Sequence, residues 1–287
     1  MFLNSNKTLL TATLLLILFF FGCTAHLFKH HPNLAEQLFE KRVSKSEKQA
    51  RKHPRNSATK LEACKNLTMY GHVFVLRESE IMEEEDFSQS REFRLEASGL
   101  FQNAYNYGLE SLDILHPGFQ ESFHKDSGVM LGKVTIEQVD YLYWTAAALG
   151  SMISTAKGDP YAIADLPKVG ILIDRAMELN ESYDKGSLHE FMISFVLSRP
   201  DSPSDAIEIA KNHFDKAVVL SGGNRASAFV TYAESICTLE QDRSEFLSML
   251  NRALEVDVNA DPDLKLSNIV SQERAAWLKE RVDDLFF

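Results

Sequence analysis

Ala210-Lys211-Asn212-His213-Phe214-Asp215-Lys216-Ala217 places an alanine, a phenylalanine and a second alanine on one face of a helix. Ala97-Ser98-Gly99-Leu100-Phe101-Gln102-Asn103-Ala104 repeats that spacing, and looser versions occur at Val169-Ile173-Ala176 and Phe246-Leu250-Ala253. Alanines let neighbouring helices approach closely, and the larger side chain fills the gap between them. The last residues of the four copies, in chain order, are 72, 41 and 36 residues apart. These separations approximate multiples of one helical pair, so the pattern predicts stacked helical hairpins.

Apolar residues recur at helical spacing through the rest of the chain, without long β-branched alternations, so we predict an all-α fold. The small–large–small spacing is that of the second helix of a tetratricopeptide unit, which predicts an α-solenoid of cryptic tetratricopeptide-like hairpins. An ordinary helical bundle is the alternative. The predicted helices are Leu34–Arg51, Leu61–Arg77, Ser90–Leu115, Ile136–Ser154, Leu166–Leu179, Gly186–Leu197, Pro203–Leu220, Arg225–Leu239, Arg243–Val256 and Pro262–Leu285.

Four of the predicted helix starts carry capping signals, either a polar residue three positions before Glu or Gln, or a polar residue before proline. These signals are Thr135 with Gln138, Asp242 with Glu245, Ser202-Pro203 and Asp261-Pro262. The acidic stretch Glu83-Glu84-Glu85-Asp86 is predicted to be a solvated loop, because its carboxylates repel one another within a helix.

The first residues of the chain have the pattern of an export signal. Lys7 precedes a mostly apolar run from Leu9 to Phe21, and Gly22 and Cys23 follow it. The run is shorter than the roughly 20 residues that a helix needs to cross a bilayer, and the whole segment resembles the lipobox of signal peptidase II substrates. We therefore expect residues 1–22 to be a lipoprotein signal peptide and Cys23 to carry acyl chains such as palmitate. An uncleaved anchor helix from Leu9 to Phe28 is the alternative.

The charge is unevenly distributed along the chain. Residues 29–60 carry nine Lys or Arg against three Glu, whereas residues 61–287 carry twenty against thirty-eight Asp or Glu, a net charge of −18. We expect residues 23–57 to form a basic stalk with a helix and residues 58–287 to form a single α-helical domain. The stalk either lies against anionic head groups or is a solvated linker with a surface helix. The acidic body makes nucleic acid an improbable partner.

Three cysteines are too few for a disulfide framework. With Cys23 attached to lipid, Cys64 and Cys237 remain. They are either two separately buried thiols or one disulfide pair.

Catalytic motifs are missing from the sequence. His189-Glu190 begins like a zinc-protease helix, but Ile193 stands where H-E-x-x-H needs its second histidine. No G-x-S-x-G, P-loop, G-x-G-x-x-G or paired C-x-x-C motif occurs. We therefore expect no enzyme activity, no catalytic residues, no metal site and no cofactor, although residues scattered along the chain could still meet in space.

Several separated blocks resemble, in order and spacing, the T component family of TRAP (tripartite ATP-independent periplasmic) transporters. The similarity covers residues 62–287 and is most specific between Asp140 and His189. The blocks are Asp140-Tyr141-Leu142-Tyr143-Trp144-Thr145-Ala146-Ala147-Ala148-Leu149-Gly150, Asp165-Leu166-Pro167, Asp174-Arg175-Ala176-Met177-Glu178-Leu179, Tyr183-Asp184-Lys185-Gly186-Ser187-Leu188-His189, His213-Phe214-Asp215-Lys216-Ala217, Tyr232-Ala233-Glu234, Gln241-Asp242-Arg243-Ser244-Glu245-Phe246, Leu266-Ser267-Asn268 and Gln272 with Arg274-Ala275.

The resemblance implies a periplasmic, lipid-tethered homotrimer that docks the transporter's substrate-binding protein. It also implies a groove or passage for a small hydrophobic or organic-acid ligand. Thr24 is not an aspartate-type retention signal, so an outer-membrane location is expected rather than an inner-membrane one. The alternatives are a general cell-envelope scaffold that binds proteins without a ligand and a periplasmic hydrolase.

Five residues in the most family-like part of the chain are candidates for ligand or partner contacts: Tyr143, Trp144, Arg175, His189 and Glu190. The aromatic side chains could line a groove, and the polar ones lie beside apolar helix faces. The alternative for each residue is a structural role, with the rings packed between helices and His189 as a hydrogen-bonded core histidine.

Overall fold

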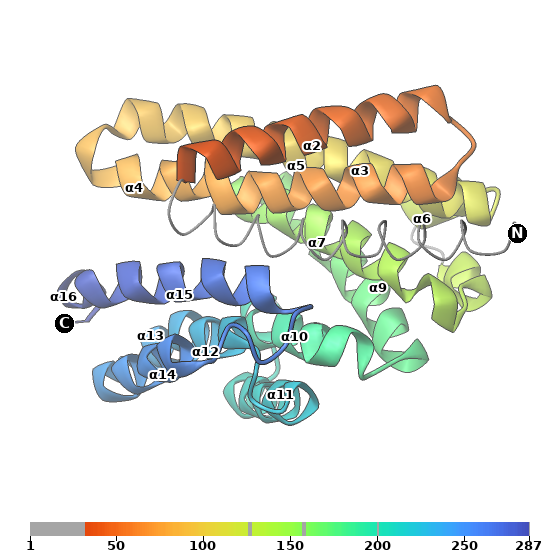
Figure 1. Ribbon diagram of the computed structural model, residues 1–287. Helices are drawn as coiled ribbons and strands as arrows, with labels where there is room; N and C mark the ends of the chain where they lie inside the picture. The colour runs from red at the N-terminus through yellow and green to blue at the C-terminus, as the bar shows by residue number, and fades with distance from the viewer. Residues whose placement is uncertain (1–31, 126–127, 157–158, 200, 287) are drawn as a thin grey trace, which may run out of the picture. The chain divides into compact units, whose positions relative to one another are not determined.

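The computed structural model describes residues 32–125, 128–156, 159–199 and 201–286. The predicted signal peptide, residues 1–22, and Cys23 lie outside these ranges. All regular elements in the described ranges are helical, with no strand among them (Figure 1). The chain therefore has an all-α, helical-repeat fold, as predicted. Nowhere in these ranges is a helix both long enough and apolar enough to span a membrane.

The chain divides into two compact units. The first is Leu38–Phe191, and the second comprises Met192–Phe287 together with the start of the chain up to Gln37. The prediction of one domain over residues 58–287 stays a prediction.

Helices of the first unit pack side by side in chain order, as antiparallel neighbours (Figure 1). A continuous helix formed by α3, the π-helical turn η1 and α4 packs against α5, α5 packs against α7, and α7 packs against α9. The elements that lie in this unit wholly or in part are α2 (Pro32–Lys52), α3 (Ser57–Tyr70), η1 (Gly71–Leu76), α4 (Arg77–Glu85), α5 (Phe87–Leu115), α6 (Phe119–His124), η2 (Gly128–Lys133), η3 (Ile136–Gln138), α7 (Val139–Thr155), α8 (Pro160–Ile163), α9 (Leu166–Leu179), η4 (Tyr183–Gly186) and α10 (Ser187–Ser198).

Helix α10 continues into the second unit, where α12 packs against α11, α14 and α15. The remaining elements are α11 (Ala206–Ser221), α12 (Ala226–Tyr232), the π-helical turn η5 (Ala233–Cys237), α13 (Thr238–Glu240), α14 (Arg243–Glu255), α15 (Lys265–Glu280) and α16 (Val282–Leu285). Phe214 of α11 fills the space beside α12, with its ring centroid 5.7 Å from that of Phe229 and 4.5 Å from that of Tyr232.

The small–large–small pattern marks core contacts in both units, as its packing rationale requires. All twelve residues of the four copies are buried. Close helix approach also depends on glycine: a Cβ on Gly108 of α5 would lie 2.5 Å from Oγ1 and 3.1 Å from Cα of Thr145 on α7. The α5–α7 contact is therefore too close for any larger residue at this position.

Two of the four capping predictions are confirmed. The backbone N–H of Thr135 donates to Gln138 Oε1 at 3.1 Å, and the backbone N–H of Glu245 donates to Asp242 Oδ1 at 2.9 Å.

The other two predictions misplace the start of a helix. The Ser202 hydroxyl donates to the carbonyl oxygens of Val196 (2.5 Å) and Arg199 (2.7 Å), so Ser202 satisfies the end of α10, and α11 begins only at Ala206. Asp261 Oδ1 accepts from the backbone N–H of Asp263 at 3.1 Å in a turn, and α15 begins only at Lys265. In both cases the polar side chain satisfies local turn groups instead of the first helical turn.

The prediction of a loop at Glu83-Glu84-Glu85-Asp86 is wrong. Glu83 to Glu85 form the last turn of α4, and Asp86 accepts hydrogen bonds from the backbone N–H groups of Ser88 and Gln89 as the N-cap of α5. Arg94 Nη2 lies 3.4 Å from Glu83 Oε2 and offsets part of the repulsion. Asp86 is the single residue between α4 and α5, so no loop separates these two helices.

Candidate binding site

Aromatic side chains gather around α7 in the first unit. The ring centroid of Tyr143 lies 5.4 Å from that of Trp144, 5.4 Å from that of Tyr183 and 6.5 Å from that of Phe191. All four side chains are half-buried, so each keeps part of its ring in contact with solvent. We refer to Tyr143, Trp144, Tyr183 and Phe191 as the aromatic cluster. Partly exposed rings of this kind offer apolar contact area with polar edges.

A charged pair flanks the aromatic cluster. Asp140 lies one helical turn before Tyr143 and Trp144, and its two carboxylate oxygens have different partners. Oδ1 accepts a hydrogen bond from the Tyr183 hydroxyl, and Oδ2 pairs with the Lys65 ammonium from α3. Lys65 Nζ also lies 5.9 Å from the centroid of the Trp144 ring. Three segments distant in sequence therefore meet at one carboxylate.

Tyr183 remains a neutral hydrogen-bond donor in this arrangement. Burial raises the pKa of its hydroxyl above the ordinary value, and the hydrogen bond to the Asp140 carboxylate raises the pKa further. The phenol is therefore protonated at any physiological pH, and its O–H remains the donor to Asp140.

The backbone after Tyr183 adopts a conformation that is rare for residues with side chains. Asp184 has φ 44° and Lys185 has φ 54°, and Gly186 follows at φ 94°. This left-handed segment carries the chain from Tyr183 into α10, which bears His189 and Phe191. Backbone strain of this kind persists only where the surroundings fix it, and it is concentrated at functional sites.

His189 and Glu190 differ in their access to solvent. His189 is fully buried on α10, and its Nε2 lies 3.2 Å from Glu181 Oε1. Glu190 is half-buried on the same helix. His189 therefore has no ring edge that a solute can reach without rearrangement, whereas Glu190 does have exposed surface.

The hydrogen bonds of Arg175 connect α9 to the segment before α7. Its Nη2 donates to the carbonyl oxygen of Val134 at 3.0 Å, and its Nη1 donates to Glu178 Oε2 at 2.9 Å. Of the five predicted site residues, Tyr143 and Trp144 lie together in the aromatic cluster, next to Phe191 of α10. Arg175 instead forms hydrogen bonds with Val134 and Glu178, which lie outside the aromatic cluster.

Lys65, Asp140, Tyr183 and Phe191 are the residues of this site that the sequence did not single out. Asp140 did carry a usable signal, because it stands three and four positions before Tyr143 and Trp144 and so shares a helix face with them. Lys65 carried none, since nothing in the sequence shows that α3 packs beside α7.

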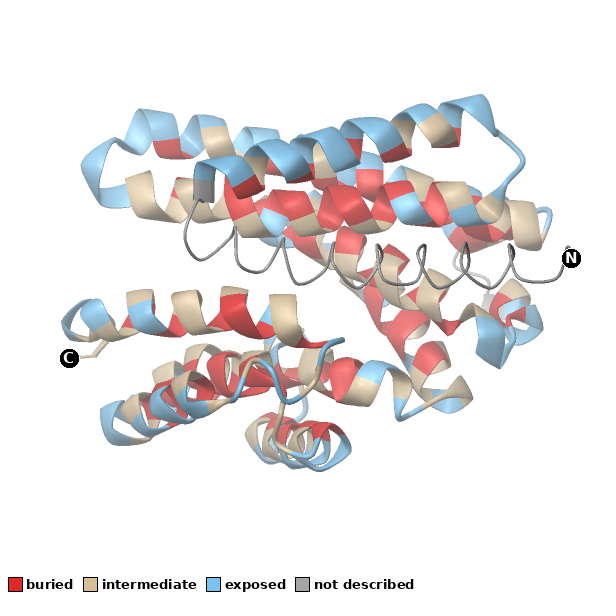
Figure 2. Cartoon of the chain, in the orientation of Figure 1, coloured by how far each residue is buried: buried red, intermediate tan, exposed pale blue. Residues whose placement is uncertain are grey.

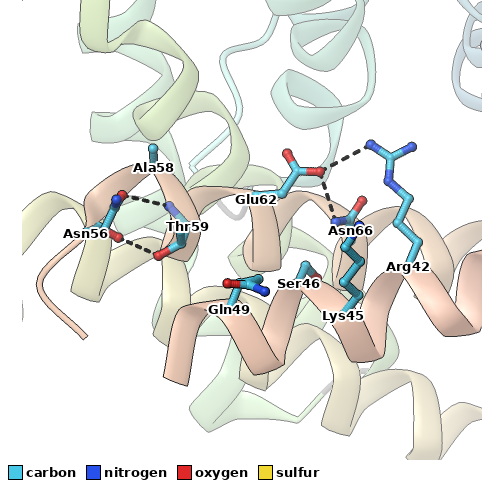
Figure 3. A pocket seen from close by; sticks show the side chains of 9 residues that line it. All are labelled: Arg42, Lys45, Ser46, Gln49, Asn56, Ala58, Thr59, Glu62 and Asn66. Carbon is cyan, nitrogen blue, oxygen red and sulfur yellow. Dashed lines mark hydrogen bonds and ion pairs between the residues drawn. The ribbon is translucent and has the colours of Figure 1, made fainter. Parts of the chain in front are cut away.

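A separate pocket of about 390 Å³ lies between α2 and α3 (Figure 3). At its wall, Glu62 Oε1 accepts from Arg42 Nη2 at 3.2 Å and from Asn66 Nδ2 at 3.1 Å. Asn66 is buried, and its Oδ1 has no partner among the described residues. The lining residues are Arg42, Lys45, Ser46, Gln49, Asn56, Ala58, Thr59, Glu62 and Asn66.

No group of three or more His, Cys, Asp or Glu side chains in the described ranges is arranged to hold a metal ion. Cys64 and Cys237 are both free, buried thiols.

An all-α helical-repeat fold with half-buried aromatic side chains beside an ion pair is an arrangement suited to a protein of the binding or scaffolding class. The comparison with known families is specific. Residues 29–286 match the TRAP transporter T-component family, and the chain belongs to that family. The chain is therefore an accessory component of a TRAP transport system. It is also 30% identical over 224 residues to an uncharacterized protein of Treponema pallidum (strain Nichols), a match that covers 76% of this chain and 69% of that protein.

Proposed function

We propose that this protein is a lipid-tethered periplasmic T component that docks the substrate-binding protein of a TRAP transporter near the membrane. The proposal places the acyl chains on Cys23, favours the outer membrane, and has the protein assemble as a homotrimer. Membership of the T-component family assigns the protein to a TRAP transport system. The observation that carries the docking role is the aromatic cluster, with four half-buried rings beside the Lys65–Asp140 pair.

Aromatic side chains suit a docking role for energetic reasons. Tyr and Trp dominate the binding energy of protein interfaces, because they bury large areas and few of their rotamers must be fixed. Tyr143 and Trp144 pack edge to face at an interplanar angle of 84°, which holds both rings in place before a partner arrives. A partner side chain inserted beside them would also meet the charged Lys65–Asp140 pair.

The charge of the body sets an expectation for the partner. A net charge of −18 over residues 61–287 favours approach by a surface with positive potential. Complementary charge accelerates encounter and falls in effect as salt increases. The proposed docking is therefore expected to be faster at low ionic strength.

The same cluster is also suited to a small organic ligand. The Lys65 ammonium offers a positive charge to a carboxylate, and the rings offer apolar area. A hydrophobic or organic-acid ligand would use these groups, and native mass spectrometry of the purified protein would detect it.

The docking proposal is tested by co-purification from gently cross-linked membranes. We expect the substrate-binding protein to co-purify with the wild-type chain and to be lost with Tyr143→Ala and with Trp144→Ala. Tyr161→Ala is the matched control, because Tyr161 is an exposed aromatic residue outside the cluster. Circular dichroism and thermal unfolding of each variant separate lost contacts from lost folding.

The alternative is a general envelope scaffold without a ligand. If the wild-type chain captures other envelope proteins and never a solute receptor, the docking proposal fails and the scaffold hypothesis replaces it.

A further inference from the structure

Helix α2 presents two opposite faces that differ in chemistry. Five residues on one face are buried: Ala35, Phe39, Val43, Ser46 and Ala50. The other face is exposed to solvent, as the pale blue along α2 in Figure 2 shows. Its residues recur at alternating spacings of four and three, and they are Leu34, Leu38, Lys41, Lys45, Lys48 and Lys52. That spacing keeps all six on one narrow stripe of the helix, which we call the lysine–leucine face.

The four lysines of this face have no ion-pair partner among the described residues. Neighbouring cations on the flanks of α2 do have partners, since Arg42 Nη2 lies 3.2 Å from Glu62 Oε1 and Arg51 Nη1 lies 3.4 Å from Glu47 Oε1. No acidic residue interrupts the stripe. The positive charge of the lysine–leucine face is therefore not compensated within this part of the structure.

The lysine–leucine face also carries exposed apolar side chains beside its cations. Leu34 is 45% exposed and Leu38 is 39% exposed, both at the N-terminal end of α2. Exposed leucines beside unpaired lysines are typical of helices that lie in the interface of a membrane. There, apolar side chains enter the head-group region and cations contact lipid phosphates.

We propose that the lysine–leucine face of α2 docks on the surface of an anionic bilayer. The charge of α2 and its position in the chain both favour an anionic bilayer as its partner. Pro32 begins α2 nine residues after Cys23, where the sequence predicts lipid attachment, and nine residues span about 30 Å at most when extended. The acidic remainder of the chain would be repelled by the same bilayer, so the contact orients α2 towards the lipid.

The expected strength follows from the surface potential of anionic membranes. Each lysine near such a surface strengthens binding about fivefold, so four lysines together act strongly while any one of them acts weakly. The contact should weaken at high salt, because the Debye length falls from about 10 Å at 0.1 M to about 3 Å at 1 M.

The test measures how fast each lysine of the full chain is acetylated when the protein is bound to vesicles, using mass spectrometry of its peptides. Vesicles of phosphatidylcholine alone are compared with vesicles that also contain phosphatidylglycerol. We expect Lys41, Lys45, Lys48 and Lys52 to be protected several-fold on the anionic vesicles, and the protection to disappear at high salt. Lys125 and Lys133, which are exposed elsewhere in the first unit, should react equally on both.

Two variants make the result specific. Lys48→Glu should reduce the protection of the other three lysines about fivefold or more, whereas Lys133→Glu should leave it unchanged. Leu34→Gln combined with Leu38→Gln should reduce protection on the anionic vesicles without lowering helicity. Equal acetylation on both kinds of vesicle, equal protection of Lys133, or failure of the chain to bind the anionic vesicles would overturn the proposal. None of these outcomes bears on capture of the substrate-binding protein.

Discussion

At the scale of single residues, Asp140 connects three helical segments of the first unit, because its carboxylate serves both Lys65 and Tyr183. We predict that Asp140→Asn lowers the free energy of unfolding by about 1–2 kcal/mol, since a charge-assisted hydrogen bond and a partly exposed ion pair are both weakened. Urea unfolding measures this change. A double-mutant cycle with Lys65→Met should give a coupling energy of about 1 kcal/mol, and additive losses would contradict the pairing.

Cys64 provides a prediction about pH. The pKa of its thiol is raised from 9.0 to about 12, and burial is the largest cause of this shift. Below pH 9 the thiol is neutral in the folded and unfolded chains, so its contribution to stability is complete. Between pH 9 and 12 the unfolded chain ionises first, and stability is lost as the pH rises. Cys64→Ala should therefore show a shallower alkaline loss of stability in urea unfolding than the wild type. Parallel curves would contradict this assignment.

The candidate site was predictable from the sequence only where its residues share one helix. Tyr143, Trp144 and Asp140 lie within two turns of α7, so helical periodicity relates them. The contributions of Lys65 and Tyr183 depend on tertiary packing and on a left-handed segment at Asp184 and Lys185. Local sequence patterns favour neither, because residues other than glycine seldom adopt positive φ.

At the scale of the helices, the contact between α5 and α7 leads to a prediction about glycine. Gly108→Ala should lower the free energy of unfolding by about 1–3 kcal/mol, because the new Cβ would overlap Thr145, including its backbone. Gly99 is the matched control on the same helix, with nothing within 4 Å of a Cβ placed there. Gly99→Ala should raise stability by about 0.5–1 kcal/mol through helix propensity. Urea unfolding of both variants checks the pair, and equal effects would contradict the close approach.

The helices themselves were largely predictable, because their buried faces repeat at the period of the helix. The ends were less predictable. Ser202 and Asp261 have the residue types of N-caps, yet their side chains satisfy the groups of nearby turns. Glu83 to Glu85 continue α4 despite their repulsion, since solvent exposure weakens it and Asp86 supplies an immediate start for α5. These boundaries depend on whether a polar side chain forms its hydrogen bonds with a helix terminus or with a nearby turn, and residue type alone does not determine which of the two forms.

At the scale of the whole molecule, the chain separates positive charge near its start from negative charge in its body. Nine Lys or Arg against three Glu in residues 29–60 precede a body with a net charge of −18. This polarity suits a protein held at an anionic surface by one end while the other end meets soluble partners. Acyl chains and a cationic face would act together, because one weak membrane signal alone gives only reversible attachment.

This cooperation predicts a graded response to removal of the lipid. Cys23→Ala should leave the chain on membranes at low ionic strength, held by the lysine–leucine face, and release it at high salt, where the wild type stays bound. Fractionation of membranes followed by immunoblotting measures both states, and Cys64→Ala is the control for loss of a thiol. If the Cys23→Ala chain resists salt as the wild type does and is also processed to the same size, lipid attachment at Cys23 is wrong. An uncleaved helix from Leu9 to Phe28 would then explain the anchoring better.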